Sequence, residues 1–370
     1  MKHNTSIKTF FKYAIASITI ASSSLMCSCN LIDDDSDYNL TSSDLILRDP
    51  FVYADEDSQK YYVHGNSLIK TPNPQRKDIQ KGKALYCYES ENLKTWRLVG
   101  KSFEAPKNWW GKRDFWAPDM FKIDGKYYVI ATFSNDRVIG KRFDLPEKDL
   151  LFRGCAVLVS DKPEGPYKPL TDKPITPENW MCLDGTLYEE DGKMYLIYCR
   201  EWVEVGDGEI YAQEISRDLK KCIGTPVKLF SASQAPWVQA IKKDCYVTDA
   251  PVLNRSKAGK LFMTWSSFAE INGTKQYVIG LSYSDNGKLF GKWTHSPIPL
   301  NSDDGGHAMI FKTFEGRPKI AYHAGNKFPE KTVIKNFRFT DNDAIISDWK
   351  IFVDVPLLNT KYLKQQNPLQ

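Results

Sequence analysis

The sequence predicts an all-β fold, a five-bladed β-propeller with about four antiparallel strands in each blade. Three observations lead to this prediction. A pattern of an acidic residue or a histidine, an apolar strand, a polar turn and a second apolar strand occurs five times. The turn glycines of four copies, Gly125, Gly192, Gly259 and Gly316, are spaced by 67, 67 and 57 residues, which indicates a repeat architecture. Helical periodicity is missing throughout.

Each copy contains two runs of β-branched and aromatic residues bounded by Gly, Asp and Asn, which is the signal of an antiparallel hairpin. The five copies are RDPFVYADEDSQKYYVHG from Arg48, APDMFKIDGKYYVIATFS from Ala117, LDGTLYEEDGKMYLIYCR from Leu183, TDAPVLNRSKAGKLFMTWSS from Thr248 and GHAMIFKTFEGRPKIAYHAG from Gly306. A second, weaker hairpin follows at Cys87, Val157, Gln213 and Leu281. A β-sandwich is the structural alternative, but it would not demand such regular hairpin doublets.

The repeats leave room for one folded domain. We expect a signal peptide with a lipidation site over residues 1–29, an acidic tether over 30–44, the propeller over 45–354 and a C-terminal tail over 355–370. Hydrophobic residues make up 42% of the chain and aromatic residues 13%, which is enough for a packed β-rich core. The net charge of +4 is small and the basic residues are scattered, so nucleic acid is not an expected partner.

The first thirty residues have the composition of an export signal. Lysines precede an apolar stretch from Tyr13 to Met26 that is too short to span a membrane comfortably. The segment MCSCN resembles a bacterial lipoprotein cleavage box with Cys29 as the lipidated residue, and the acidic run after it resembles the tether of Bacteroidetes surface lipoproteins. We therefore expect an outer-membrane or cell-surface lipoprotein whose only membrane contact is its lipid anchor. Ordinary cleavage and a periplasmic location are the alternative.

Six cysteines follow Cys29, without the CxxC or Cys/His spacing of a zinc or redox site. We interpret them as small buried apolar groups, while an oxidising compartment leaves one or two disulfides open.

In a propeller the innermost strands all start on one face, so residues at the same point of each repeat converge on the axis. These residues are Asp49, Asp119, Asp184, Asp249 and His307. The second strands return to that face and bring His64, Ser134, Glu201, Ser267 and His323 to the same rim. An aspartate at a strand start can cap a turn, but turn capping does not require one at equivalent points of four blades. We interpret the set as functional.

Carboxylates crowded in an aromatic-lined funnel suit the cleavage of a glycosidic bond. One carboxylate stays ionised as a base, while a second, with a raised pKa, protonates the leaving oxygen. Like charges in one site cannot all ionise at neutral pH, so crowding itself supplies the acid form.

Five short segments, in their order along the chain, resemble glycoside hydrolase family 43. They are RDPF with Asp49, WAPD with Asp119, LDGTLY with Asp184, TDAP with Asp249 and GGHAMIF with His307. The resemblance covers about residues 45–355. It implies an inverting five-bladed propeller enzyme that acts on arabinose- or xylose-containing polysaccharides, or on galactose-type linkages. It also implies that Asp49 is the general base and that Asp184 tunes the pKa of the acid and orients it.

One departure from the family pattern concerns the general acid. The family has a glutamate, usually in EGP, where this chain has Asp249. Aspartate is one methylene shorter, so its carboxyl falls about 1.5 Å short, a misplacement that can be costly. Either the pocket is tighter around Asp249, or Glu201 acts as the acid from the rim. We favour Asp249 by position, with Glu201 as its rival.

The remaining site predictions concern the axis and the walls. The family often holds an ion on the axis, and His307 resembles the residue that borders it, so a calcium ion is open although no cofactor is required. A lone histidine is more often a channel-lining hydrogen-bond donor than a metal ligand. Trp116, Trp202 and Phe51 adjoin the carboxylates, and we expect them to bind sugar together with Asp119 and His307.

These features predict an exported glycosidase that releases terminal arabinofuranosyl or xylosyl units from plant polysaccharide and binds oligo- or polysaccharide. The alternative is a non-catalytic glycan-binding surface lipoprotein, in which the change from glutamate to aspartate has ended catalysis. A glycoside phosphorylase would want a basic phosphate cradle, and the motif residues show no such cluster.

Overall fold

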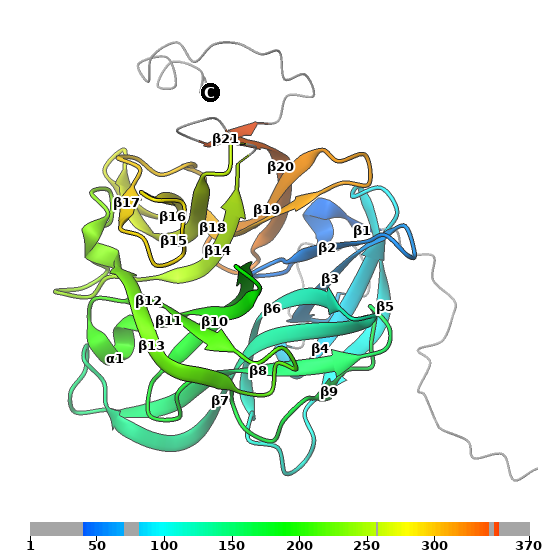
Figure 1. Ribbon diagram of the computed structural model, residues 1–370, viewed down its shortest axis with the longest axis horizontal. Coiled ribbons are helices and arrows are strands. Elements are labelled where there is room, and N and C mark those ends of the chain that lie inside the picture. Colours follow the sequence, from blue (N-terminus) through cyan, green and yellow to red (C-terminus); the bar gives the residue numbers. More distant parts are fainter. Residues whose placement is uncertain (1–39, 70–80, 257, 340–343, 348–370) are drawn as a thin grey trace, which may run out of the picture. The chain divides into compact units, whose positions relative to one another are not determined.

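Five antiparallel sheets stand around one centre in the computed structural model of the chain, which describes residues 40–69, 81–256, 258–339 and 344–347 (Figure 1). Four of the sheets have four strands and the first has five. The arrangement confirms the predicted five-bladed β-propeller. The predicted signal peptide and lipidation site, the start of the tether and the C-terminal tail lie outside the described residues.

Each blade is an antiparallel meander, and the strands β2, β6, β10, β14 and β18 contact one another around the centre. Blade 1 consists of β1 (Leu40–Thr41), β2 (Val52–Asp55), β3 (Lys60–Ser67), β4 (Lys81–Ser90) and β5 (Thr95–Glu104). Blade 2 consists of β6 (Arg113–Ile123), β7 (Lys126–Lys141), β8 (Asp149–Ser160) and β9 (Lys168–Pro169). Blade 3 consists of β10 (Cys182–Glu190), β11 (Lys193–Arg200), β12 (Glu209–Ile215) and β13 (Cys222–Ser231).

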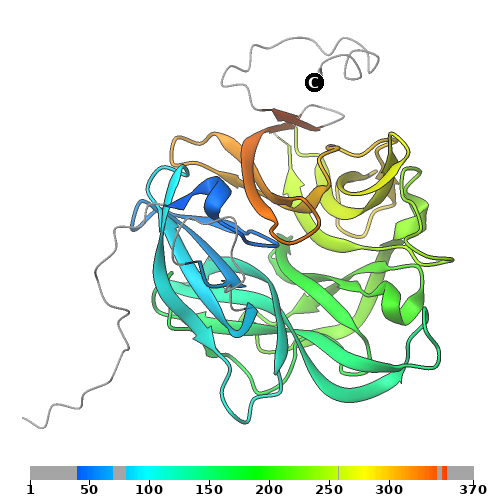
Figure 2. The same cartoon turned by 180° about the vertical axis from the view of Figure 1, so that it is seen from behind.

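Blades 4 and 5 repeat the same order of strands, and their ribbons are easily followed from behind (Figure 2). Blade 4 consists of β14 (Asp249–Arg255), β15 (Leu261–Ile271), β16 (Thr274–Ser284) and β17 (Trp293–His295). Blade 5 consists of β18 (Gly305–Lys312), β19 (Pro318–Ala324), β20 (Lys331–Phe339) and β21 (Ala344–Ser347).

Helices in the described residues are single turns. They are η1 (Ser42–Asp44), α1 (Trp202–Val205) and η2 (Ala232–Gln234). The strand β1 and the turn η1 lie inside the segment 30–44 that we predicted as a tether. No helix of the described part of the chain combines the length and apolar character that a membrane crossing needs.

Two-residue turns close the inner hairpins of blades 2 and 3. Asp124 and Gly125 have φ of 49° and 76°, and Asp191 and Gly192 have φ of 51° and 74°. Positive φ at both positions is the type I′ turn, whose twist matches that of the flanking strands. The Asp-Gly pairs therefore fix the register that sets where each inner strand begins.

The core lies between the blades, where large rings interlock. Between blades 3 and 4, for example, Phe230, Trp237 and Trp265 are all buried, and the rings of Trp237 and Trp265 lie 5.1 Å apart. The predicted cysteine role is confirmed for five of the six, since only Cys222 is partly exposed, and all six are free thiols.

We predict that Gly280→Ala destabilises the protein because the strand β16 passes directly under Trp237. A Cβ at Gly280 would lie 2.1 Å from Trp237 Cζ2, so the ring would have to move. Overpacking of this kind costs about 1–3 kcal/mol of unfolding free energy, which thermal or urea unfolding measures. Gly140→Ala is the matched control, since the nearest atom to its Cβ is 4.0 Å away. Equal stability of the two variants would contradict this packing.

Candidate active site

The inner strands share an irregularity where they enter the centre. Pairing with the second strand shifts by one residue between Trp116 and Asp119, Leu183 and Thr186, Asp249 and Val252, and Gly306 and Met309. Inside each shift lies a residue with a left-handed backbone, and the same backbone occurs just before β2: Asp49 (φ 58°), Ala117 (φ 45°), Asp184 (φ 56°), Ala250 (φ 51°) and His307 (φ 56°). Such φ values are uncommon outside glycine and cluster at functional sites. Blades 2 to 5 therefore each carry a β-bulge where the inner strand enters the centre, and blade 1 has the same left-handed backbone at Asp49, just before β2.

The bulges correct the predicted equivalence of the five central residues. Asp49, Asp184 and His307 are equivalent, as predicted, but Asp119 lies two residues after the left-handed position and Asp249 one residue before it. The repeat words could not show this, because a bulge adds a residue without changing the composition of the strand. Both carboxyls nevertheless reach the centre, where their charges interact with Asp49.

Hydrogen bonds between blades hold the bulges in place. A bulge frees backbone N–H groups from the strand ladder, and buried N–H groups need another acceptor. The N–H of Asp184 donates to Thr132 Oγ1 at 2.9 Å, that of Ala250 to Asp184 Oδ2 at 3.0 Å, and that of His307 to Ser266 Oγ at 2.8 Å. Each central residue is thus fixed by the preceding blade.

Asp49 is a buried carboxylate held by histidines. Its Oδ1 lies 3.1 Å from His307 Nδ1, 3.3 Å from His323 Nδ1 and 3.8 Å from Arg48 Nε. Burial opposes ionisation of Asp49, but His307, His323 and Arg48 outweigh it and hold its pKa well below the usual value. Burial lowers the pKa of His307 to about 4, so this imidazole is neutral rather than cationic at neutral pH. Asp49 is therefore an ionised acceptor, as a general base must be.

The pKa values of Asp184 and Asp249 are raised, in contrast to that of Asp49. Burial raises the pKa of Asp184 well above its usual range, and repulsion from Asp249 and Asp49 adds to it. Burial likewise raises the pKa of Asp249 to about 7, with the charges of Glu201 and Asp49 contributing. A hydrogen bond from the Tyr277 hydroxyl to Asp249 Oδ2, 2.9 Å long, works in the opposite direction. One site thus holds an ionised base and carboxyls that keep protons near neutral pH.

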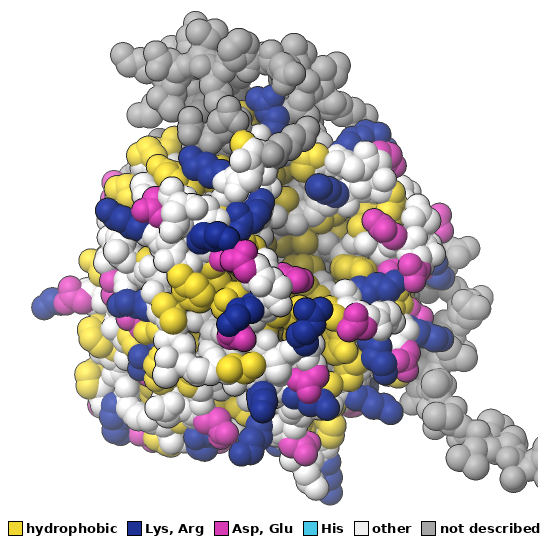
Figure 3. All heavy atoms as spheres, in the orientation of Figure 1, with side chains coloured by type: hydrophobic (Ala, Val, Ile, Leu, Met, Phe, Trp, Pro, Cys, Tyr) yellow, Lys and Arg dark blue, Asp and Glu magenta, His cyan; other side chains and the backbone are white. Residues whose placement is uncertain are grey.

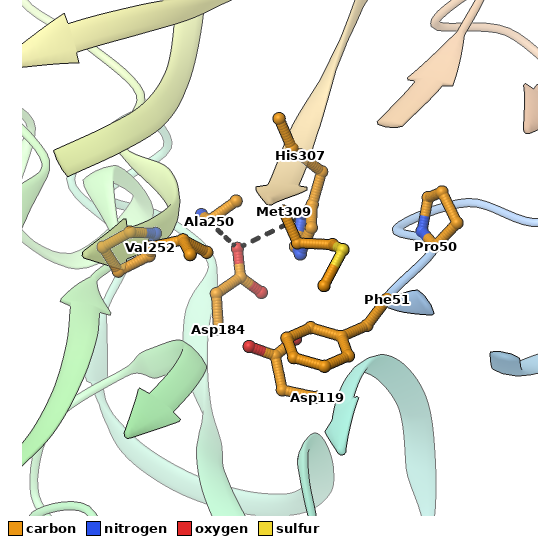
Figure 4. A pocket seen from close by; sticks show the side chains of 10 residues that line it. Pro50, Phe51, Asp119, Asp184, Ala250, Val252, His307 and Met309 are labelled. Carbon is orange, nitrogen blue, oxygen red and sulfur yellow. Dashed lines mark hydrogen bonds and ion pairs between the residues drawn. The ribbon is translucent and has the colours of Figure 1, made fainter. Parts of the chain in front are cut away.

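Asp119 lines a small cavity on the axis together with Phe51, Asp184 and His307 (Figure 4). In this view the ring of Phe51 lies next to the Asp119 carboxyl, and dashed lines join Asp184 to Ala250 and His307. Burial raises the pKa of Asp119 to about 8, against a hydrogen bond with Thr186. A carboxyl that keeps its proton is a hydrogen-bond donor, so Asp119 is suited to a neutral ligand such as a sugar.

The carboxylate of Glu201 is paired with an arginine. It lies just past the end of β11, where its carboxylate forms an ion pair with the buried Arg153. Arg153 also contacts Asp114 Oδ2 at 3.1 Å and lies 4.4 Å from the centre of the Trp116 ring. Trp116 keeps 36% of its surface exposed, so a ligand can reach the indole that Arg153 supports. Glu201 is thus paired with a cation, whereas Asp249 accepts a hydrogen bond from the Tyr277 hydroxyl, and the choice of Asp249 over Glu201 as proton donor stays a prediction.

Trp202 and His64 have other neighbours than the sequence led us to expect. Trp202 begins α1 and packs against Leu150, Met181 and Val203, so its role in binding sugar stays a prediction. His64 was expected at the rim, but its ring nitrogens contact Ser102 Oγ at 2.9 Å and the carbonyl of Pro163 at 3.1 Å. In the β3 register it lies below the rim, opposite Cys87 of β4.

The carboxylates keep a narrow opening to solvent. Asp49 retains 8% exposure and Asp184 7%, while Asp249 is more exposed than either. The space-filling view shows acidic and basic side chains scattered over the face that it presents, with no single basic stripe (Figure 3).

Calcium beside His307 stays a prediction. Calcium prefers six to eight oxygen ligands. Within residues 40–69, 81–256, 258–339 and 344–347 no group of three or more His, Cys, Asp or Glu side chains is arranged to hold a metal ion. His307 Nδ1 is already engaged with Asp49.

Sequence reasoning missed two side chains that organise the site. Tyr277 comes from the third strand of blade 4 and Arg153 from the third strand of blade 2, whereas the sequence argument considered the first two strands of each blade. No motif marks either residue. The only signals for Tyr277 were indirect. Gly306 leaves space for a neighbouring ring, and the short side chain of Asp249 needs a partner that fixes its carboxyl.

Comparison with known proteins matches most of the chain to one protein family. The model of the glycosyl hydrolases family 43 matches residues 45–345. An endo-arabinase structure from Bacteroides thetaiotaomicron VPI-5482 is 43% identical, with a TM-score of 0.72, over 83% of this chain and 99% of that chain. An α-L-arabinofuranosidase from Lactobacillus brevis is 18% identical, with a TM-score of 0.62, over 84% and 95% of the two chains, a likeness that shows the fold alone.

A shorter match links the chain to a second kind of relative. Xylosidase/arabinosidase 43A from Humicola insolens is 33% identical over 94 residues. These residues are 25% of this chain and 24% of the relative, so the match spans about a quarter of that protein.

Proposed function

The chain belongs to family 43 of the glycosyl hydrolases and is a glycoside hydrolase, and from that premise we propose that it hydrolyses arabinofuranosyl linkages of plant polysaccharide with inversion. The feature that carries the proposal is the pairing of two buried carboxyls whose pKa values are shifted in opposite directions, that of Asp49 lowered by His307, His323 and Arg48 and that of Asp249 raised by burial. The names of the similar proteins, an endo-arabinase and a xylosidase/arabinosidase, support the choice of sugar.

The proposed reaction is a single displacement. Asp49 takes a proton from a water molecule while that water attacks the anomeric carbon, and Asp249 gives its proton to the leaving glycosidic oxygen. The C–O bond to the leaving sugar breaks as the bond to water forms on the opposite face, so the configuration inverts. An inverting site needs about 6.5–9.5 Å between its two carboxyls, which leaves room for the water. Asp184 Oδ2 accepts a hydrogen bond from the N–H of Ala250, so it holds the backbone next to Asp249.

Two modes of attack are candidates. Release of terminal arabinofuranosyl or xylosyl units is the sequence-based expectation. Cleavage inside an arabinan chain is the second candidate, and the 43% identity to an endo-arabinase favours it. Incubation with linear arabinan separates them: free arabinose alone indicates terminal release, and a ladder of oligosaccharides indicates internal cleavage. Sugar binding without any turnover on aryl arabinofuranosides, aryl xylosides, linear arabinan or xylan would contradict the proposed hydrolysis and leave a glycan-binding protein.

We predict that kcat/KM falls as pH rises through about 7. The acid must carry its proton, and the Asp249 pKa is raised to about 7, so activity is present below that pH and is lost above it. The lowered pKa of Asp49 keeps the base ionised well into the acidic range. A pH–rate profile with a natural oligosaccharide measures this, and activity unchanged from pH 6 to pH 9 would contradict the assignment of Asp249.

Export and anchoring complete the proposal. We propose that Cys29 carries a lipid at the surface of a Gram-negative cell, which would bring the propeller to polymeric substrate outside the cell. Metabolic labelling with a fatty acid tests this: the wild type should be labelled and Cys29→Ser should not. Equal labelling of both would contradict it.

A further inference from the structure

Tyr277 holds the carboxyl of Asp249. The tyrosine lies on β16, the third strand of blade 4, and is 1% exposed. Its hydroxyl donates a hydrogen bond to Asp249 Oδ2 at 2.9 Å. A protonated carboxyl has one oxygen that carries the proton and one that accepts hydrogen bonds. Because Oδ2 is the acceptor here, the transferable proton belongs on Oδ1.

The ring of Tyr277 is itself fixed on several sides. It stacks on His323, with centroids 5.5 Å apart and planes at 15°, and it lies 5.3 Å from Phe268. Its backbone N–H donates to Asp304 Oδ1 at 2.8 Å. A Cβ at Gly306 would stand 2.3 Å from Tyr277 Cε1, so the glycine of the fifth inner strand leaves the space that the ring fills. The hydroxyl therefore has a defined position.

The same ring connects the proposed acid to the proposed base. His323, the stacking partner of Tyr277, places its Nδ1 3.3 Å from Asp49 Oδ1. Arg48 also spans the two, with its guanidinium 5.9 Å from the centre of the Tyr277 ring and its Nε 3.8 Å from Asp49 Oδ1. The two carboxyls thus share one rigid support built from blades 1, 4 and 5.

We propose that Tyr277 is a positioning residue that sets the proton-donating oxygen of the short acid Asp249 and, through His323, keeps it in register with Asp49. This inference rests on the proposed function. An aspartate lacks the reach of a glutamate by about 1.5 Å, and misplacement of about 1 Å can cost about 100-fold in rate. A fixed hydroxyl that selects one orientation of the shorter carboxyl reduces that loss.

The charges around Asp249 define what Tyr277 does to its proton. The titratable or charged groups that act on Asp249 are Tyr277, Glu201, Asp49 and Arg48, and the charge of Asp249 in turn raises the pKa of Asp184. Burial, Glu201 and Asp49 raise the pKa of Asp249, and the Tyr277 hydrogen bond and Arg48 lower it. Removal of the hydroxyl should therefore raise this pKa and extend activity to higher pH.

The first test is Tyr277→Phe, which removes the hydroxyl and keeps the ring against His323. We expect kcat/KM on a natural arabino-oligosaccharide to fall about 10- to 100-fold. An aryl arabinofuranoside with a good leaving group should lose much less, because it needs little protonation. The alkaline limb of the pH profile should move up. Tyr198→Phe is the matched control, since this tyrosine is fully buried in blade 3 and its hydroxyl has no hydrogen-bond partner in the described part of the chain.

The second test is a double-mutant cycle with Asp249→Glu. If Tyr277 compensates for the short acid, Tyr277→Phe should cost clearly less in the Asp249→Glu background than in the wild type. Equal costs in the two backgrounds, or a Tyr277→Phe variant within twofold of wild type on natural linkages, would overturn the inference. The proposed acid itself fails by a different result, namely full activity of Asp249→Asn on natural linkages.

Discussion

Asp49→Asn is expected to reduce kcat on every substrate by about 10²–10⁴-fold, the range that a positioned general base contributes. The change keeps the size of the side chain but removes the charge that activates water. The loss should be the same for natural linkages and for aryl arabinofuranosides with good leaving groups, because attack by water is needed in both. Steady-state kinetics on both substrate types measures it.

The control for Asp49→Asn is Asp57→Asn, which alters an exposed aspartate in the turn after β2 that forms an ion pair with Lys122. This control should keep wild-type rates. If Asp49→Asn retained more than about a tenth of the activity, the charge on Asp49 would not be what activates water.

Asp249→Asn should be selective in its effect. We expect a loss of about 10²–10⁴-fold on natural linkages, whose leaving oxygen needs a proton, and a small loss on aryl substrates with good leaving groups. Asparagine still accepts the hydrogen bond from Tyr277, so the site should stay in place while the proton is gone. Comparison of kcat/KM for the two substrate types is the measurement.

Glu201→Gln is the matched comparison for Asp249→Asn. It removes the charge that pairs with Arg153, so we expect a loss that does not depend on the leaving group, together with a lower Asp249 pKa, because a nearby negative charge is gone. The reverse pattern, with Glu201→Gln selective for natural linkages and Asp249→Asn indifferent, would make Glu201 the proton donor.

The fold could be predicted from the sequence because its signals are local. Asp-Gly turns such as Asp191 and Gly192 set short hairpins, and alternating β-branched and aromatic residues fill the strands between them. Five such units cannot bury their faces alone, so they close on one another. The one-turn helix α1 was not predicted, because four residues are too few to show a helical period.

The site was predicted in part. Asp49, Asp184 and His307 were found at their equivalent positions because each begins its repeat in the same way. Asp119 and Asp249 were assigned to the centre, but neither occupies the left-handed position that Asp49, Asp184 and His307 share. That position falls on Ala117 and Ala250, and the bulges there leave no mark in the pattern of apolar residues. Tyr277 could not be found, because its contact with Asp249 joins two strands 28 residues apart in sequence through the tertiary fold.

The most direct test of the central claim is the configuration of the first sugar released, observed by proton NMR as the wild-type enzyme cleaves an α-arabinofuranoside. The centre of the propeller holds Asp49 with a lowered pKa to activate water and Asp249 with a raised pKa to assist departure, so a single displacement should release the β-anomer first, with the α-anomer appearing later by mutarotation. Initial release of the α-anomer would require a covalent intermediate and would contradict the account.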